Sequence, residues 1–237
     1  MDSVWTLLSF GPKGWSDDIA YGVLVTISLA LATLPIGLVI GFFVAVAKQS
    51  SEPSLRMAGN VYTTIFRGLP ELLTLFVVFY GGQIAVGQVI QFFSPGTVVE
   101  VNSFVAGMIA LGVVFSSYCS EVFLSAFRAI PAGQYEGGYA IGLSKGQTMR
   151  LVVLPQLIRI ALPGLANLWL NLLKDTALVS AIGLPDTLRQ AGIAARVTKE
   201  AFLFFGVACL VFLVLAMISS IGIHAIGRKV GSSGVSR

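Results

Sequence analysis

Residues 135–155 read YEGGYAIGLSKGQTMRLVVLP, and this polar, turn-rich stretch interrupts a chain that is otherwise close to continuous hydrocarbon. The 237 residues are 56% hydrophobic and 11% charged, whereas soluble domains carry about 25% charged residues. The composition therefore predicts a membrane protein, and the length suits one domain over residues 1–237. The opening stretch is then expected to be a connection between apolar spans.

Apolar segments lie on both sides of this stretch, and each approaches the about 20 residues that a helix needs to cross the hydrocarbon core. They cover residues 19–47, 69–93, 104–127, 157–173 with a continuation to 183, and 202–226. The fourth segment contains Arg159, Pro163, Lys174 and Asp175, so we expect it inside the bundle, with its polar side chains toward protein or water. The predicted fold class is an all-α membrane protein with five transmembrane helices.

The distribution of Lys and Arg predicts an orientation, because cytoplasmic connections carry the excess of positive charge. Cations gather between spans one and two, between spans three and four, and after span five, namely Lys48, Arg56, Arg67, Arg128, Lys145, Arg150, Arg159, Arg228, Lys229 and Arg237. The connection at residues 94–103 has none. This pattern predicts the N-terminus outside and the C-terminus in the cytoplasm. Because the cations lie at span ends, the net charge of +4 does not indicate nucleic-acid binding.

Residues 174–199 depart from that pattern. They hold four cations but must lie outside if the number of spans is odd. The sequence GLPDTLRQAG within them combines turn signals with an amphipathic stretch. It predicts a short helix at the outer surface.

Turn and capping signals in the opening stretch, and just before it, predict two short helices. Pro131 is well placed in the first turn of a helix that runs to Ile141, and Gly142 offers a stop. Ser144 with Gln147 makes an S-x-x-Q capping box that starts the second helix. Since a simple connection needs only a few residues, a rigid pair of helices here indicates that another protein docks on it.

The spacing within the stretch resembles the EAA loop of ABC-importer permeases, which reads E-A-A, three residues, G, nine residues and I-x-L-P. The matches are Glu136, Gly142, Leu154 and Pro155, and the departures are Gly137 and Gly138 for the alanines and Val152 for isoleucine. Each glycine weakens the first helix by about 1 kcal/mol relative to alanine. Residues 67–73, running into Tyr80 and Gly81, and residues 174–180 resemble segments of the polar amino-acid subgroup. The similarity covers nearly the whole chain and is strongest to histidine/lysine/arginine/ornithine and opine permeases.

This resemblance implies the type I ABC-importer permease fold and a contact with an ATPase subunit. In that family the EAA loop is the coupling helix that fits a cleft on the ATPase, and the corresponding residues here are Tyr135, Glu136, Gly137, Gly138, Ala140, Gly142 and Lys145. No G-x-x-x-x-G-K-[ST] motif occurs in this chain. ATP and Mg are therefore expected on a partner ATPase homodimer, with no cofactor in this chain.

The resemblance also implies further partners and a location. Five spans do not readily enclose a pathway, so a second homologous permease, or a second copy of this chain, is expected. A soluble solute-binding protein, periplasmic or extracellular, would deliver a polar, basic amino acid or an opine. Import would proceed by alternating access in the bacterial cytoplasmic (inner) membrane.

Three acids lie within or beside the predicted spans, where an ionised side chain costs on the order of 2.5 to 3.5 kcal/mol and needs a partner or a role. They are Glu71, Glu121 and Asp175, and with Ser180 they form the predicted substrate pathway. Each acid also has a structural interpretation. Glu71 is placed to pair with Arg67 four residues earlier. Glu121 lies among Ser117, Ser120 and Ser125, which suggests a hydrogen-bond network, and Asp175 is adjacent to Lys174, which suggests an ion pair.

Other residues favour structural roles. Pro35, Gly37 and Gly41 in the first span are expected to permit close helix packing, with hinges for alternating access as the alternative. His224 is expected to be an interfacial side chain. Cys119 and Cys209 have no CxxC spacing, which favours packing thiols over a metal site.

Two other classes of function remain as alternatives to transport. A membrane-embedded enzyme would need a catalytic set, and the sequence has a single histidine and neither an HExxH nor a GxSxG motif, so no catalytic residue is predicted. A non-transporting membrane scaffold with a docking loop is the other alternative.

Overall fold

The structure is a computed structural model that describes residues 4–93 and 101–232, with side chains as far as Arg228. Within these ranges every regular element is a helix. Among the described residues, five helices are long and apolar enough to cross a membrane, which confirms the prediction at the level of length and composition. They are Ser16–Gln49, Glu71–Phe93, Ser103–Ala129, Lys145–Ile182 and Ala201–Arg228.

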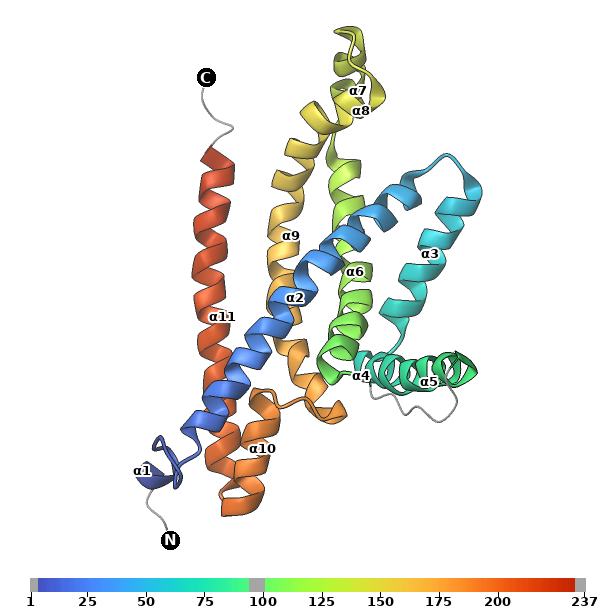
Figure 1. The fold of residues 1–237 in the computed structure, drawn as a ribbon. Coiled ribbons are helices and arrows are strands. Elements are labelled where there is room, and N and C mark those ends of the chain that lie inside the picture. Colours follow the sequence, from blue (N-terminus) through green and yellow to red (C-terminus); the bar gives the residue numbers. More distant parts are fainter. Residues whose placement is uncertain (1–3, 94–100, 233–237) are drawn as a thin grey trace.

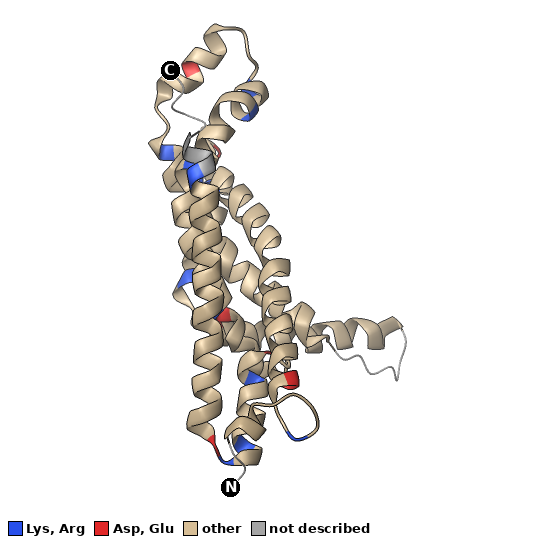
Figure 2. Ribbon diagram, turned by 90° about the vertical axis from the view of Figure 1, so that its left-hand side faces the viewer, with Lys and Arg blue, Asp and Glu red and all other residues tan. Residues whose placement is uncertain are grey.

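Long helices form the bundle, and in Figure 1 most of them run broadly along one axis while the first crosses them obliquely. They are α2 (Ser16–Gln49), α6 (Ser103–Ala129), α9 (Leu154–Asp175) and α11 (Ala201–Ser232). One end of the bundle holds three short elements, and α11 also ends there. They are α7 (Ala132–Ala140), α8 (Lys145–Thr148) and the π-helix η2 (Met149–Val153). The short N-terminal helix α1 (Val4–Leu7) and α10 (Thr187–Thr198) lie at the other end. Figure 2 shows charged residues mostly toward these two ends.

The second predicted span has the expected length but a different direction. It comprises α4 (Glu71–Phe76), η1 (Val77–Gly81) and α5 (Gly82–Phe93), and Figures 1 and 2 show it running across the other long helices. Instead α3 (Pro53–Gly68) runs along the bundle and packs against α2 and α6. The physical reason is Pro70, whose ring disfavours a helical conformation at the preceding residue, so that Leu69 is extended and α3 ends.

The most extensive helix contact joins α2 and α6 through small residues. A Cβ atom at Gly41 would lie 2.7 Å from the Cβ atom of Cys119 and 2.8 Å from the backbone oxygen of Ser116. A Cβ atom at Gly37 would collide with the ring of Phe115. The two helices therefore approach so closely that only glycine fits, which favours packing as the role of these glycines.

The short helix predicted near residue 187 is present as α10. The side chain of Asp186 caps it, because Oδ1 accepts a hydrogen bond of 3.0 Å from the backbone N–H of Arg189. Asp186 is fully buried, and this burial raises the pKa of its carboxyl to about 6. Between α9 and α10 the 3₁₀-helix η3 (Thr176–Ile182) ends at Gly183, whose φ of 93° belongs to the left-handed region.

Candidate functional site

The knob, which we define as residues 131–148, consists of α7, α8 and the turn between them. Pro131 stands just before α7 rather than in its first turn, and α7 ends at Ala140 with Ile141 as its C-cap. Gly142 has a φ of 86°, so the glycine stop is confirmed. The backbone N–H of Leu143 then donates 3.1 Å to the carbonyl oxygen of Gly138, which closes the turn onto α7.

The second half of the knob begins with the predicted capping box, which is confirmed. The backbone N–H of Ser144 donates to Oε1 of Gln147 at 2.9 Å, and the backbone N–H of Gln147 donates to Oγ of Ser144 at 3.4 Å. The helical path continues through η2 into α9. The capping box therefore starts the long helix that leads into the bundle.

Gly137 and Gly138, the two departures from the E-A-A pattern, occupy different environments. Gly138 is buried, and a Cβ atom there would lie 2.6 Å from Cγ2 and 2.8 Å from Oγ1 of Thr148. At Gly137 a Cβ atom would meet nothing within 4 Å. Thr148 thus leaves no room for a side chain at position 138, whereas position 137 has room for one.

The surface of the knob combines apolar and charged side chains. Ile141 is 76% exposed and Tyr139 is 46% exposed, and Glu136, Ala140, Gly142 and Lys145 are exposed beside them. Tyr135 is half-buried and packs against the core of the bundle. A tip that exposes apolar side chains together with an acid and a base has the composition of a protein–protein contact surface.

Glu71 and Asp175 meet in a cavity of about 190 Å³ between α4, α6 and α9. Tyr118 and Asn171 supply further polar groups, and the remaining lining residues are Leu111, Val114, Phe115, Leu168 and Leu172. The expected ion pair between Asp175 and Lys174 is not among the ion pairs of the described residues. Lys174 is exposed instead. Two acids far apart in the sequence are thus neighbours, and together they can attract a cation.

Ser180, the fourth predicted pathway residue, does not line the cavity of Glu71 and Asp175. Its carbonyl oxygen accepts a hydrogen bond of 3.2 Å from Nη1 of Arg189. It lines a separate cavity of about 380 Å³ together with Arg189 and Arg196. The structure therefore separates Ser180 from the two acids with which it was grouped.

Glu121 lies in neither of these cavities but between two cations from other helices. Its Oε1 contacts Nζ of Lys48 on α2 and lies 3.5 Å from Nη1 of Arg67 on α3. The expected pair of Arg67 with Glu71 is therefore replaced by a pair with Glu121, because Pro70 ends the helix between positions 67 and 71 and separates the two side chains.

The serines near Glu121 do not form the expected network with its carboxylate. The hydroxyl of Ser117 donates to the carbonyl oxygen of Val114 at 2.6 Å, and that of Ser120 donates to the carbonyl oxygen of Ser117 at 2.7 Å. Hydroxyls inside a helix readily bond to the preceding turn, and this satisfies them without the acid. Ser125 is exposed.

Sequence reasoning missed the two basic partners of Glu121, because Lys48 was interpreted as a marker of orientation and Arg67 was also paired with Glu71. A signal was nevertheless present on α3, where Arg56, Asn60, Thr64 and Arg67 recur at helical spacing on its exposed side. The last three of these line a cavity of about 540 Å³ beside Glu121 and Tyr118. A polar stripe on a helix within an apolar bundle indicates a face directed toward water or another protein.

Among the described residues, no group of three or more His, Cys, Asp and Glu side chains is placed to hold a metal ion. Cys119 is buried and Cys209 is exposed, and both are free thiols. His224 is exposed, with Nδ1 2.9 Å from the carbonyl oxygen of Ser220 in its own helix.

Comparison with known proteins places this geometry in a family. Residues 37–231 match the family described as the binding-protein-dependent transport system inner membrane component. The chain is 39% identical to the nopaline transport system permease protein NocQ of Agrobacterium fabrum, over 92% of each chain. It is 37% identical to the histidine/lysine/arginine/ornithine transport system permease protein HisQ of Escherichia coli, over 87% of this chain and 90% of the relative.

Solved structures show the same fold. One chain in the crystal structure of an amino acid ABC transporter with histidines superposes with a TM-score of 0.76 at 28% identity, covering 91% of this chain and 95% of that one. An inward-facing MetNI methionine ABC transporter gives a TM-score of 0.73 at 20% identity, covering 90% of this chain and 96% of that one.

Proposed function

Because the chain belongs to the family of binding-protein-dependent transport system inner membrane components, we propose that it moves basic amino acids or opines across the bacterial cytoplasmic (inner) membrane. It is the permease subunit of an ABC importer of the polar amino-acid and opine group, and a transport protein rather than an enzyme. The observation that carries the proposed specificity is the cavity in which Glu71 and Asp175 meet. Two acids beside Tyr118 and Asn171 favour a solute with a cationic end.

The proposed mechanism is alternating access driven by ATP on a separate subunit. A solute-binding protein delivers the solute outside, closure of an ATPase homodimer that binds ATP and Mg moves the knob, and the bundle opens inward. The exposed Ile141 and Tyr139, with Glu136 and Lys145, support the knob as the contact with the ATPase. In this arrangement the knob and the C-terminus lie in the cytoplasm, and α10 and the N-terminus lie outside.

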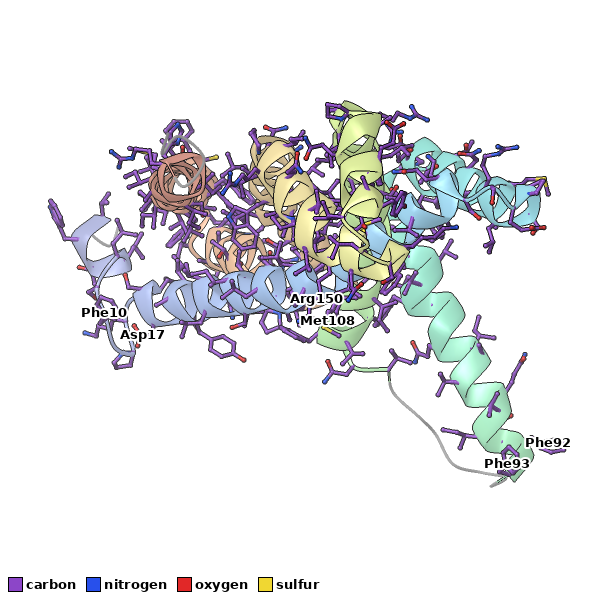
Figure 3. The ribbon with its side chains drawn as sticks, turned by 90° about the horizontal axis from the view of Figure 1, so that it is seen from above. Phe10, Asp17, Phe92, Phe93, Met108 and Arg150 are labelled. Atoms are coloured by element: carbon purple, nitrogen blue, oxygen red, sulfur yellow. The ribbon has the colours of Figure 1, made fainter. Side chains whose placement is uncertain are left out.

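A second permease chain, either homologous or another copy of this one, completes the pathway in this proposal. The segment α4 to α5 supports a second chain, because α5 projects from the bundle with Phe92 and Phe93 at its tip (Figure 3). These two side chains are 83% and 80% exposed. Large apolar surfaces of this kind are suited to contact with lipid or with another membrane protein.

The specificity is tested by Glu71→Gln and Asp175→Asn in the importer reconstituted in liposomes with its ATPase and binding protein. Removing either charge should reduce uptake of arginine or lysine about 10-fold or more, because a charge-assisted contact contributes about 1.5 to 3 kcal/mol. Uptake of glutamine and basal ATP hydrolysis should change little. Equal losses for arginine, glutamine and ATP hydrolysis would assign both acids to structure and remove the argument for basic solutes.

The docking role of the knob is tested by reversing one charge at each end of the molecule. Glu136→Lys should weaken co-purification of the ATPase and abolish solute-stimulated hydrolysis. Glu200→Lys makes the same change at an exposed residue at the opposite end and should leave the ATPase bound. If both variants retain the ATPase and transport normally, the knob is not the coupling contact.

The orientation is tested with single-cysteine reporters. A reporter at Ser144 should react only after the membrane is permeabilised, whereas one at Arg196 on α10 should react from outside. A reporter at Ser94, in the predicted outer connection, should also react from outside, although that position falls outside the described residues. Reversed labelling at Ser144 and Arg196 would overturn the proposed orientation.

A further inference from the structure

The cavity of about 540 Å³ beside Glu121 carries more positive than negative charge. It is lined by Lys48, Asn60, Thr63, Thr64, Arg67, Gly68, Tyr118 and Glu121. Two cations therefore face one carboxylate, and one positive charge is left uncompensated. An anionic group in this cavity would balance that charge.

The two cations are not equally free to bind that group. The side chain of Lys48 is only 7% exposed, and its Nζ contacts Glu121 and donates 3.0 Å to Oγ1 of Thr63. The side chain of Arg67 is 45% exposed and holds Glu121 only through a long ion pair of 3.5 Å from Nη1. A guanidinium carries five N–H donors in a planar fork that matches a carboxylate. Arg67 is thus the group that can receive a carboxylate in this cavity.

Tyr118 joins this cavity to the one that holds the two acids. It lines both cavities, and the guanidinium carbon of Arg67 lies 5.5 Å from the centre of its ring. Glu71 and Asp175 line the other of these two cavities. A cationic group and an acidic pair are thereby placed around one side chain, which is the charge pattern that complements a dipolar solute.

We propose that Arg67 binds the carboxylate of the transported solute while Glu71 and Asp175 hold its cationic end. The ligand class is a zwitterion that carries a carboxylate and a basic group, and Tyr118 lines both subsites. This inference rests on the proposed function, since it assigns a second contact to the same solute. It makes Arg67 a specificity-determining residue as well as a partner of Glu121.

The experiment is a binding cycle with two probes that differ only in the carboxylate. Arginine and its decarboxylated amine, agmatine, compete against labelled arginine on the complete permease–ATPase complex in nanodiscs. The wild-type complex should bind arginine at least about 10-fold more tightly than agmatine, because a bond to a charged group is lost in the amine. In Arg67→Gln the affinity for arginine should fall to that for agmatine, and the affinity for agmatine should stay within about twofold of wild type.

Two further variants keep the result interpretable. Arg56→Gln removes the same charge from the same exposed stripe of α3, but Arg56 does not line this cavity, so discrimination should persist. Arg67→Lys keeps the charge opposite Glu121 and loses the fork. If Arg67→Gln does not assemble with the ATPase, Arg67→Lys is used in its place. Its affinity for arginine should fall several-fold, whereas its affinity for agmatine should not change.

The outcomes separate this inference from the proposed function. If loss of Arg67 weakens both probes by the same factor, or leaves their ratio unchanged, Arg67 does not contact the carboxylate and the inference is overturned. Equal binding of the two probes to the wild-type complex also overturns the inference, while import of basic solutes stands. Binding of neither probe to the wild-type complex would overturn the proposed function and this inference together.

Discussion

The knob and the Glu121 cluster are both polar interruptions of an apolar chain, but they are assembled differently. The contacts that shape the turn of the knob, such as the capping box and the approach of Gly138 to Thr148, lie within residues 131–148. The Glu121 cluster, which consists of Lys48, Arg67 and Glu121, joins three helices, and Lys48 and Glu121 stand 73 positions apart. Substitutions in the knob should therefore act locally, whereas substitutions at helix crossings should affect the whole bundle.

The largest loss of stability is expected from a substitution where α2 and α6 are in contact. Gly41→Leu would place a side chain against the Cβ atom of Cys119 and the backbone of Ser116, so α2 and α6 must separate. We expect a loss of about 3 kcal/mol or more, measured as a lower melting temperature in detergent. The control is Gly206→Leu on α11, where a Cβ atom meets nothing within 4 Å. Equal melting of the two variants would contradict the close crossing.

The next effect concerns the Glu121 cluster. Glu121→Gln leaves Lys48, which is 7% exposed, without its counter-charge. We expect a loss of about 2 to 3 kcal/mol, below the figure for a fully buried pair because Glu121 itself is 32% exposed. The double variant Lys48→Gln with Glu121→Gln should recover part of that loss. Additive losses in the double variant would mean that the two side chains do not act as a pair.

A smaller and local effect is expected in the knob at position 138. Gly138→Ala brings a methyl group to 2.6 Å from Cγ2 of Thr148, which should cost about 1 to 2 kcal/mol. Hydrogen exchange should show faster opening of residues 131–148, with the melting of the bundle unchanged. Adding Thr148→Ala should restore protection. If the bundle itself melts earlier, the knob is not an independent local unit.

The smallest expected effect is a gain in stability rather than a loss. Gly137→Ala meets no neighbour within 4 Å and replaces a glycine inside α7, so it should stabilise that helix by up to about 1 kcal/mol. The same hydrogen-exchange measurement should show slower opening of α7. Together with Gly138→Ala, this variant separates helix propensity from packing at adjacent positions. A loss of protection at 137 would refute the assignment of an open environment there.

Features that depend on neighbours in the sequence were predicted correctly, whereas contacts between helices far apart in the sequence were not. The capping box of Ser144 and the glycine stop at Gly142 were predicted because each depends on neighbours a few residues away. The partners of the three acids were not predicted. Arg67 was matched with Glu71 by spacing, but Pro70 ends the helix between them and Glu121 takes its place.

The sequence by itself determined an all-helical membrane chain, the extent of its apolar helices and the local form of the knob. These properties depend on composition, on runs of apolar residues and on short-range hydrogen bonds, which the order of residues specifies directly. Only the tertiary structure decided that α3 lies along the bundle while α4 to α5 run across it, that Glu71 meets Asp175, and that Lys48 and Arg67 hold Glu121. The physical reason is that an ionised group in a low-dielectric bundle pairs with whichever opposite charge or polar neighbour the packing of the helices brings near it. That packing depends in turn on close approaches between helices, such as that of Gly41 to Cys119.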